Sequence, residues 1–192
     1  MLSSAYDRLI STTKKLLWEK GYESTSPKDI QKLSEVGQGS FYHHFSSKKK
    51  LAIAALEETL LELSNGLENL TKGKNSFEKI EFYLTAPRDA LRGCKLGRLA
   101  MEKSVIDDQE LIEPLVKYFE KVTKRLENIL KEGQDSCEFK SGFPVHEVAS
   151  SVIAIVQGGY VLSRIMKSSK PLESATNGAL VMLKSLLIHP KK

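Results

Sequence analysis

Apolar residues recur at intervals of three and four along most of the 192-residue chain, and Gly, Pro and short polar stretches separate the segments that show this interval. That spacing places apolar side chains on one face of an α-helix, whereas a half-buried β-strand would alternate apolar and polar residues. No segment alternates in this way for any length, so the pattern predicts an all-α fold. The predicted helices are 4–20, one after residue 47 that ends near Thr71, one from Ser76 that stops near Pro87, a short one over 96–101, and 107–133, 145–166 and 172–188.

Two short helical patterns, separated by a turn, follow residue 25. Ser26 is expected to cap the first, because its hydroxyl can accept a hydrogen bond from the first helical turn. Asp29 places a negative charge at the positive end of the same helix. Ile30 and Leu33, three residues apart, are expected to form its inward edge.

The second short helix has an aromatic side and a polar side. Gly37 can cap it, and Val36 gives the preceding turn an apolar anchor. At 100° per residue, Phe41 and Phe45 lie away from the polar side, so both are expected to be buried. The residues that share the polar, reachable arc are Gln38, Gly39, Tyr42 and His43. Two short helices joined by a turn, with polar groups exposed on the second, are the layout of a helix-turn-helix DNA reader.

Three consecutive lysines, Lys48–Lys50, open the next predicted helix. Cations at this end oppose the helix dipole at a cost of ~0.3–1 kcal/mol each, and a bound phosphate would reverse that cost. Residues 1–50 contain nine basic and five acidic side chains, so they hold most of the formal charge of +5. This distribution favours DNA binding by the N-terminal part. The alternative is a small helical hairpin that carries ordinary solvated lysines.

The run VGQGSFYHHF over Val36–Phe45, followed by Ser47-Lys48 and Leu51, resembles the signature of the TetR family of bacterial transcriptional regulators. The resemblance is specific over about residues 8–56. A second stretch, Gly93–Ala100, is similar to the regulatory domain of one TetR subgroup.

The resemblance implies a three-helix DNA-binding head and a helical domain for effector binding and dimerisation, which we place at residues 1–50 and 51–192. It implies a homodimer that binds double-stranded DNA at a near-palindromic operator. It also implies a repressor that a small apolar or amphipathic molecule releases from the operator. We expect that molecule to shift the predicted helix that carries Leu56–Leu70 and so to change the separation of the two DNA-reading helices.

The chain departs from the family pattern at three positions. Glu35 stands at the turn position where the family usually has Gly, and Gly37 stands in place of the usual serine cap. Lys49 replaces the acidic residue that usually follows the first lysine of the next helix. If the turn needs a left-handed residue, Glu35 is strained by about 1 kcal/mol.

Roles at the DNA can be assigned from the chemistry of these side chains. Lys48, with Lys49 or Lys50, is expected to contact phosphates, as is the hydroxyl of Thr25 or Ser26. These contacts fix register without reading sequence. Gln38 can pair with adenine, and the absence of a side chain at Gly39 allows close backbone approach. The further candidates are Ser40, Tyr42 and His43, with Tyr42 assigned mainly to phosphate by the resemblance.

Candidates for effector binding are aromatic and soft side chains within residues 76–165. They are Phe82, Tyr83, Cys94, Met101, Tyr118, Phe119, Gln157 and Tyr160. A ligand cavity among helices is lined by such groups, and so is an ordinary core, and the sequence leaves both interpretations open.

The last two predicted helices are the candidates for dimerisation. The first is apolar nearly all round between Val152 and Leu162, and Gly158-Gly159 would let another helix approach closely. Together they suggest a four-helix interface between two copies, which the resemblance also implies. The alternative is that both helices fill only the chain's own core.

Several functions lack residues to support them. The sequence shows no apolar run of about 20 residues and no secretory signal, so a cytoplasmic protein without a membrane partner is expected. It shows no motif for catalysis, a metal or a phosphate-binding cofactor, so we expect no enzyme and no cofactor. Cys94 and Cys137 are expected to be free thiols. Two alternatives to effector control remain, a redox-sensing DNA-binding regulator that uses Cys94 and a constitutive DNA binder without effector.

Overall fold

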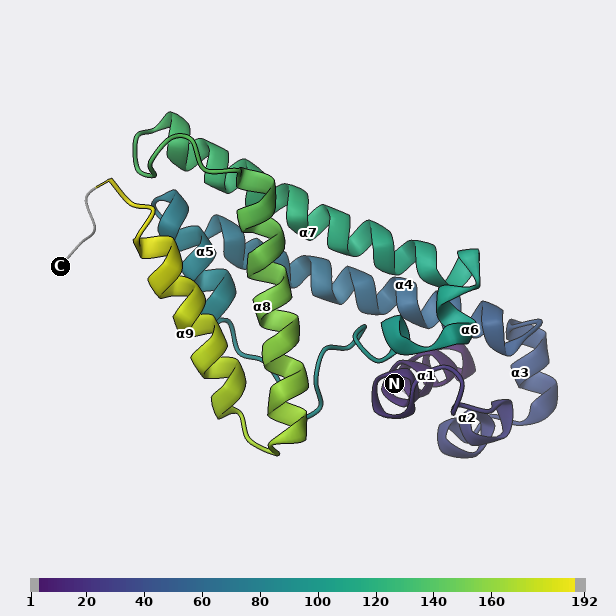
Figure 1. Ribbon diagram of the computed structural model, residues 1–192. Helices are drawn as coiled ribbons and strands as arrows, with labels where there is room; N and C mark the ends of the chain where they lie inside the picture. The colour runs from purple at the N-terminus through teal and green to yellow at the C-terminus, as the bar shows by residue number, and fades with distance from the viewer. Residues whose placement is uncertain (1–3, 189–192) are drawn as a thin grey trace. The chain divides into compact units, whose positions relative to one another are not determined.

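The computed structural model describes residues 4–188, and within them the secondary structure is helical apart from one isolated β-bridge between Phe139 and Leu187. The predicted all-α fold is therefore confirmed (Figure 1). The α-helices are α1 (Ala5–Lys20), α2 (Pro27–Ser34), α3 (Gln38–His44), α4 (Lys48–Gly66), α5 (Ser76–Thr85), α6 (Lys103–Ile106), α7 (Gln109–Asp135), α8 (Val145–Ile165) and α9 (Lys170–Lys184). The 3₁₀ helices are η1 (Leu67–Thr71) and η2 (Leu99–Met101).

The chain divides into two compact units. Unit 1 contains the described residues up to Leu63 together with Cys94–Tyr118, and unit 2 contains Ser64–Gly93 together with the described residues from Phe119 onwards. The units meet after residues 63, 93 and 118, whereas the sequence predicts a single domain boundary after residue 50. Residues 94–118 belong with the N-terminal helices because they pack against them, although about thirty residues of unit 2 separate the two segments in sequence.

In unit 1, α1 and α2 pack together and α3 contacts α1 (Figure 1). α1 begins after a capping box in which Ser4 and Asp7 exchange hydrogen bonds, and it ends at Gly21, which has a φ of 86°. Leu9, Thr13, Leu16 and Leu17 form a buried stripe along this helix. The predicted cap of α2 is also confirmed, because Ser26 and Asp29 form a second capping box.

The predicted inward edge of α2 is half wrong. Ile30 is fully buried, but Leu33 is 57% exposed. The buried partner of Ile30 is Ser34, four residues on rather than three. A helix of only eight residues has room for one such pair, and the way it packs on α1 selects which one.

Two predicted helices differ in detail. The helix expected to end near Thr71 stops as an α-helix at Gly66 and continues as η1, while Leu67 and Leu70 remain buried. The short helix expected over 96–101 is η2, preceded by turns.

In unit 2, α5 packs on η1 and on α9. The helix predicted from Ser76 does begin there, and its cap is Asn75, whose side chain accepts a hydrogen bond from the Glu78 N–H at 2.8 Å. Ser76 is the first helical residue, and its N–H donates to Glu138 at 2.8 Å. The Phe77 N–H donates to the other oxygen of Glu138 at 2.9 Å, so a carboxylate from the loop after α7 caps α5.

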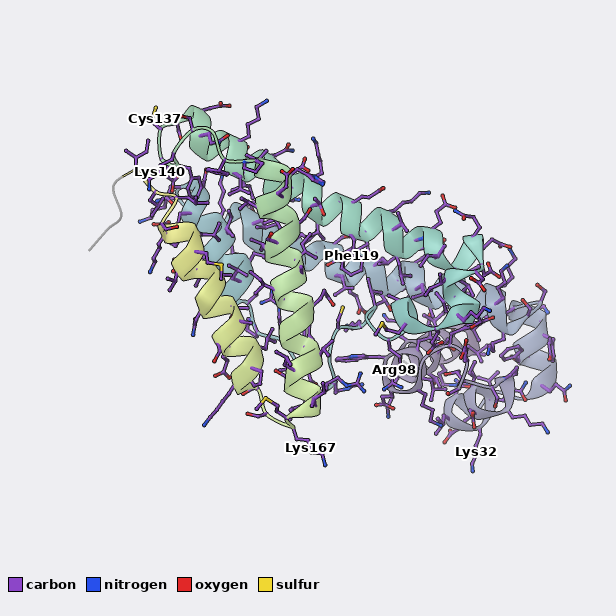
Figure 2. All side chains as sticks on the ribbon, in the orientation of Figure 1. Lys32, Arg98, Phe119, Cys137, Lys140 and Lys167 are labelled. Atoms are coloured by element: carbon purple, nitrogen blue, oxygen red, sulfur yellow. The ribbon has the colours of Figure 1, made fainter. Side chains whose placement is uncertain are left out.

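That loop, residues 136–144, also contributes to the core of unit 2. Phe139 is 1% exposed, and Gly133 lies so close to it that a Cβ there would meet the Phe139 ring at 2.2 Å. The Lys140 N–H donates to the Leu186 carbonyl at 2.8 Å, which ties the loop to the chain after α9. Figure 2 shows Cys137 and Lys140 in this loop.

α8 and α9 lie side by side in unit 2 (Figure 1). Gly159 permits the close approach that was predicted, since a Cβ there would meet Leu172 at 2.7 Å, whereas the corresponding position at Gly158 has open space. Ser163 is fully buried and accepts a hydrogen bond from the Leu172 N–H at 3.0 Å.

Each of these two helices has a second, apolar face that the chain leaves uncovered. Its most exposed residues are Val161, Leu162, Ile165, Val181 and Met182, all at 50–71% exposure. By length and composition α8 could cross a membrane, contrary to the sequence-based expectation that no segment could. Such a helix is weak support for a membrane span, because a packing helix of a soluble protein has the same composition.

Candidate DNA interface

The turn before α3 contains a left-handed residue at the position where the family usually has Gly. Glu35 lies in the left-handed region, with φ 55° and ψ 35°. Val36 is buried at 4% exposure, as predicted, and Gly37 is the N-cap of α3. The turn therefore redirects the chain through a strained non-glycine residue.

α3 is held by the two phenylalanines that the pattern selected. Phe41 is fully buried, and Phe45, at the C-cap, is 7% exposed. Tyr6 of α1 stacks on Phe45 with ring centroids 5.2 Å apart and also meets the edge of His44 at 6.0 Å. Tyr6 was not identified from the sequence, because its contact with α3 depends on how α1 packs.

The opposite side of α3 is open to solvent. Gln38, Gly39, Tyr42 and His43 are all exposed, and Ser40 is half-buried. Half of the Tyr42 side chain is exposed, and no atom lies within 4 Å of where a Cβ on Gly39 would be. A short, anchored helix thus presents amide, phenol and imidazole groups on one surface, and these groups can hydrogen-bond to base edges and phosphates.

The two hydroxyl candidates for phosphate contact are already engaged. Thr25 is 1% exposed, and its hydroxyl donates to the Gly21 carbonyl at 2.6 Å. Its assignment to phosphate is therefore wrong for this conformation, because the side chain is buried. The Ser26 hydroxyl donates to Asp29 at 2.9 Å and accepts from the Asp29 N–H at 3.1 Å. The Ser26 hydrogen bond holds the pKa of Asp29 below its usual range.

Lys48 is also engaged within the protein. Its Nζ donates to the Tyr22 carbonyl at 2.9 Å and lies 4.0 Å from the centroid of the Tyr22 ring. Partial burial lowers the pKa of Lys48, although the carboxylates of Glu102 and Glu23 act in the opposite direction. The ammonium group has three donors, so one bond to Tyr22 leaves capacity for a phosphate.

The next two lysines pair with carboxylates. Lys49 Nζ lies 2.7 Å from Asp108 and 2.8 Å from Glu110, and Lys50 Nζ lies 2.7 Å from Glu110. Hydrogen bonds from both lysines lower the pKa of Glu110 to about 2. These carboxylates offset the unfavourable helix dipole in the absence of phosphate. No local signal identified them, since some sixty residues separate them from the lysines.

The residues proposed for effector binding fall in both units. Phe82, Tyr83, Phe119, Gln157 and Tyr160 belong to unit 2, and Cys94, Met101 and Tyr118 belong to unit 1. Met101 is 80% exposed on η2, which does not fit a residue enclosed by a ligand, and Phe82 is 46% exposed. The other six are half-buried. The guanidinium of Arg88, three residues after the end of α5, lies 5.1 Å from the centroid of the Tyr83 ring.

The two thiols are free and lie in different surroundings. Cys94 is half-buried at the start of the unit 1 segment, and Cys137 is exposed in the loop after α7. The redox role of Cys94 stays a prediction. Over residues 4–188, no group of three or more His, Cys, Asp or Glu side chains is arranged to hold a metal ion.

Two family models match the chain. Residues 9–55 match the N-terminal model of the bacterial regulatory proteins of the tetR family, and residues 76–179 match the tetracyclin repressor-like C-terminal domain. The chain is 26% identical over 169 residues to the HTH-type transcriptional repressor DhaR of Mycobacterium sp. (strain GP1), a match that covers 86% of this chain and 85% of DhaR. It is 25% identical over 193 residues to the HTH-type transcriptional repressor NemR of Escherichia coli (strain K12), covering 96% and 94%.

Solved structures share the fold. A TetR transcriptional regulator from Chloroflexus aurantiacus aligns with a TM-score of 0.88 at 22% identity, covering 95% of this chain and 96% of that one. A TetR-family regulator from Cytophaga hutchinsonii aligns with a TM-score of 0.85 at 22% identity, covering 98% and 100%.

Proposed function

Because the chain belongs to the TetR family of bacterial transcriptional regulators, we propose that the exposed face of α3 reads a near-palindromic operator and that a small molecule releases it. The observation that supports this most directly is the polar surface of Gln38, Tyr42 and His43 on a helix anchored by Phe41 and Phe45. This surface lies within the segment that matches the DNA-binding model. The protein would act in the cytoplasm, where its DNA is.

The roles of the side chains follow from their chemistry. Gln38 can form two hydrogen bonds with adenine in the major groove, and a pair of this kind discriminates against other bases by about 1–3 kcal/mol. Tyr42 and Lys48 contact phosphates, which contribute affinity but little sequence information. His43 and Ser40 are placed to contact bases or backbone beside them.

A homodimer would present two copies of α3 to the DNA. The exposed apolar faces of α8 and α9 support dimerisation through these helices, because large uncovered apolar surfaces mark interfaces and a pair of helices from each copy makes a four-helix bundle. In a two-fold dimer the reading helices contact half-sites about 34–36 Å apart, or a multiple of that distance.

The effector proposed is a small apolar or amphipathic molecule. The half-buried aromatic groups Tyr83, Phe119 and Tyr160 of unit 2 are the lining that such a molecule would need. It must bind the DNA-free form more tightly than the DNA-bound form, since a ligand shifts an equilibrium only by its differential affinity. Repression is supported by the two relatives named as repressors.

Selection of duplexes from a random library by the full chain tests the DNA-binding proposal. We expect a near-palindromic site to be enriched. Gln38→Ala should relax sequence preference at one position of each half-site. Lys48→Ala should weaken binding to all duplexes alike and reduce the slope of log affinity against log salt by about 0.9 per lysine lost.

The matched control is Lys121→Ala, which removes an exposed lysine from the unit 2 part of α7. It should leave the salt slope close to that of the wild type. Enrichment of no common sequence, or a Lys48→Ala slope equal to that of Lys121→Ala, would contradict the proposed interface. Addition of apolar small molecules to the bound complex then separates a ligand-responsive regulator from a constitutive DNA binder.

A further inference from the structure

An acidic segment of unit 1, residues 102–110, contacts the DNA-binding helices at several points. It follows η2, includes α6, and ends at the first turn of α7. Its carboxylates include Glu102, Asp108 and Glu110, each of which contacts the N-terminal helices or the turns between them. The sequence by itself indicates no function for residues 102–110.

Reciprocal hydrogen bonds hold the first half of the acidic segment against the turn between α1 and α2. One oxygen of Glu102 accepts the N–H groups of both Tyr22 and Glu23, each at 2.8 Å. In return, the Glu23 carboxylate accepts the Ser104 N–H at 3.0 Å, and this hydrogen bond lowers the pKa of Glu23. Gly21 makes this approach possible, because a Cβ there would lie 1.6 Å from an oxygen of Glu102.

The second half of the acidic segment pairs with Lys49 and Lys50 at the start of α4. Lys49 bridges Asp108 and Glu110, and Glu110 bridges Lys49 and Lys50, with distances between 2.7 and 2.8 Å. Hydrogen bonds from these carboxylates raise the pKa of Lys49, which favours its charged form while it is paired. Asp108 also accepts the Glu110 N–H at 3.0 Å, which fixes the pair of carboxylates at the first turn of α7.

We propose that the acidic segment is an intramolecular competitor for the DNA backbone. Lys49 and Lys50 directly follow Lys48, at the helix end that the proposed function places beside phosphates. A lysine ammonium paired with a carboxylate is less available to a phosphate, since DNA must displace the carboxylate and leave it unpaired. The contact therefore lowers the affinity for all DNA and reduces the number of phosphates neutralised.

This proposal rests on the proposed DNA-binding function and adds a means of regulation to it. The acidic segment lies beyond residue 55, outside the part that matches the DNA-binding model. Any ligand that favours the paired arrangement over the open one would weaken DNA binding, which is the direction expected of an inducer.

The test compares two full-length variants that each remove one negative charge from α7. Glu110→Gln removes the carboxylate shared by the two lysines. Glu113→Gln removes one that pairs with Lys117 at 2.6 Å, a turn further along the same helix. Affinity is measured by fluorescence anisotropy for the selected operator and for a duplex of random sequence, at several salt concentrations.

We expect Glu110→Gln to bind both duplexes about two- to tenfold more tightly than Glu113→Gln, the range for losing one or two exposed ion pairs. The ratio between operator and random duplex should stay the same, because phosphate contacts read no sequence. The salt slope should steepen by about 0.9 for each lysine released. In a Lys49→Met/Lys50→Met background, Glu110→Gln should change neither quantity.

Equal behaviour of Glu110→Gln and Glu113→Gln would overturn the proposal, and so would weaker binding by a folded Glu110→Gln protein. Circular dichroism and thermal unfolding establish that each variant is folded. Failure of both the wild type and Glu110→Gln to bind any duplex would instead overturn the DNA-binding function. Binding by Glu110→Gln alone would support competition strongly.

Discussion

At the scale of single residues, the turn between α2 and α3 depends on Glu35. A left-handed conformation brings the Cβ of an L-residue close to the following carbonyl, and only glycine avoids this cost. The sequence indicated this strain because Glu35 stands where the family usually has Gly. The observed φ of 55° lies in the left-handed region, as that strain requires. The Glu35 side chain is exposed, so it buries little surface that could offset the cost.

We predict that Glu35→Gly raises the free energy of unfolding by about 1 kcal/mol, because relief of the left-handed strain exceeds the added entropy of the unfolded chain. Urea denaturation followed by circular dichroism measures this. Lys15→Gly, at an exposed position inside α1, is the control and should lower the free energy by about 1 kcal/mol. Destabilisation by both substitutions would show that the turn is not strained.

At the scale of elements, distant side chains complete several of the helices. α2 has a local capping box, but the N-terminus of α5 depends on Glu138, 62 residues from Ser76. The seven-residue α3 is too short to be stable alone and depends on Phe41 in the core. The positions of helix ends in this protein therefore depend on tertiary contacts as well as on the local sequence.

We predict that Glu138→Ala lowers the free energy of unfolding by about 2 kcal/mol, because two helix N–H groups lose a charged acceptor. Glu120→Ala, at an exposed position in the middle of α7, should change it by less than about 0.5 kcal/mol. Thermal unfolding and hydrogen exchange at Ser76 and Phe77 measure the two effects. Unchanged protection of these amides in Glu138→Ala would exclude the capping role.

At the scale of the whole molecule, α8 and α9 each have one face packed in unit 2 and another that is apolar and uncovered. On α8 the buried positions are Ala149, Val152, Val156, Gly159 and Ser163, and the uncovered stripe includes Val161, Leu162 and Ile165. The two helices therefore fill the core of their own unit, and the uncovered faces are the surface that we propose for a second copy.

We predict that Ile165→Arg converts the dimer to a monomer, since a charge at a desolvated apolar interface is unpaired. Sedimentation velocity measures the mass, and affinity for the palindromic site should fall with it. Val116→Arg, at an exposed apolar position in unit 1, is the control and should leave the mass unchanged. A dimeric Ile165→Arg protein would place the interface elsewhere.

The sequence by itself determined the features that depend on neighbours three or four residues apart. Helical periodicity, the Ser26 cap and the buried pair of Phe41 and Phe45 are set by such local relations, and so is the resemblance carried by residues 36–51. Tertiary structure decided the exposure of Leu33, because the way α2 packs selects its buried edge.

Tertiary structure also decided which carboxylates meet which N–H groups and lysines. The pairs Glu102 with Tyr22, Lys50 with Glu110 and Ser76 with Glu138 join residues 80, 60 and 62 positions apart. Periodicity cannot identify such pairs, because a solvated carboxylate and one that caps a helix or covers a lysine have the same local sequence. Only the path of the folded chain brings the partners within hydrogen-bonding distance.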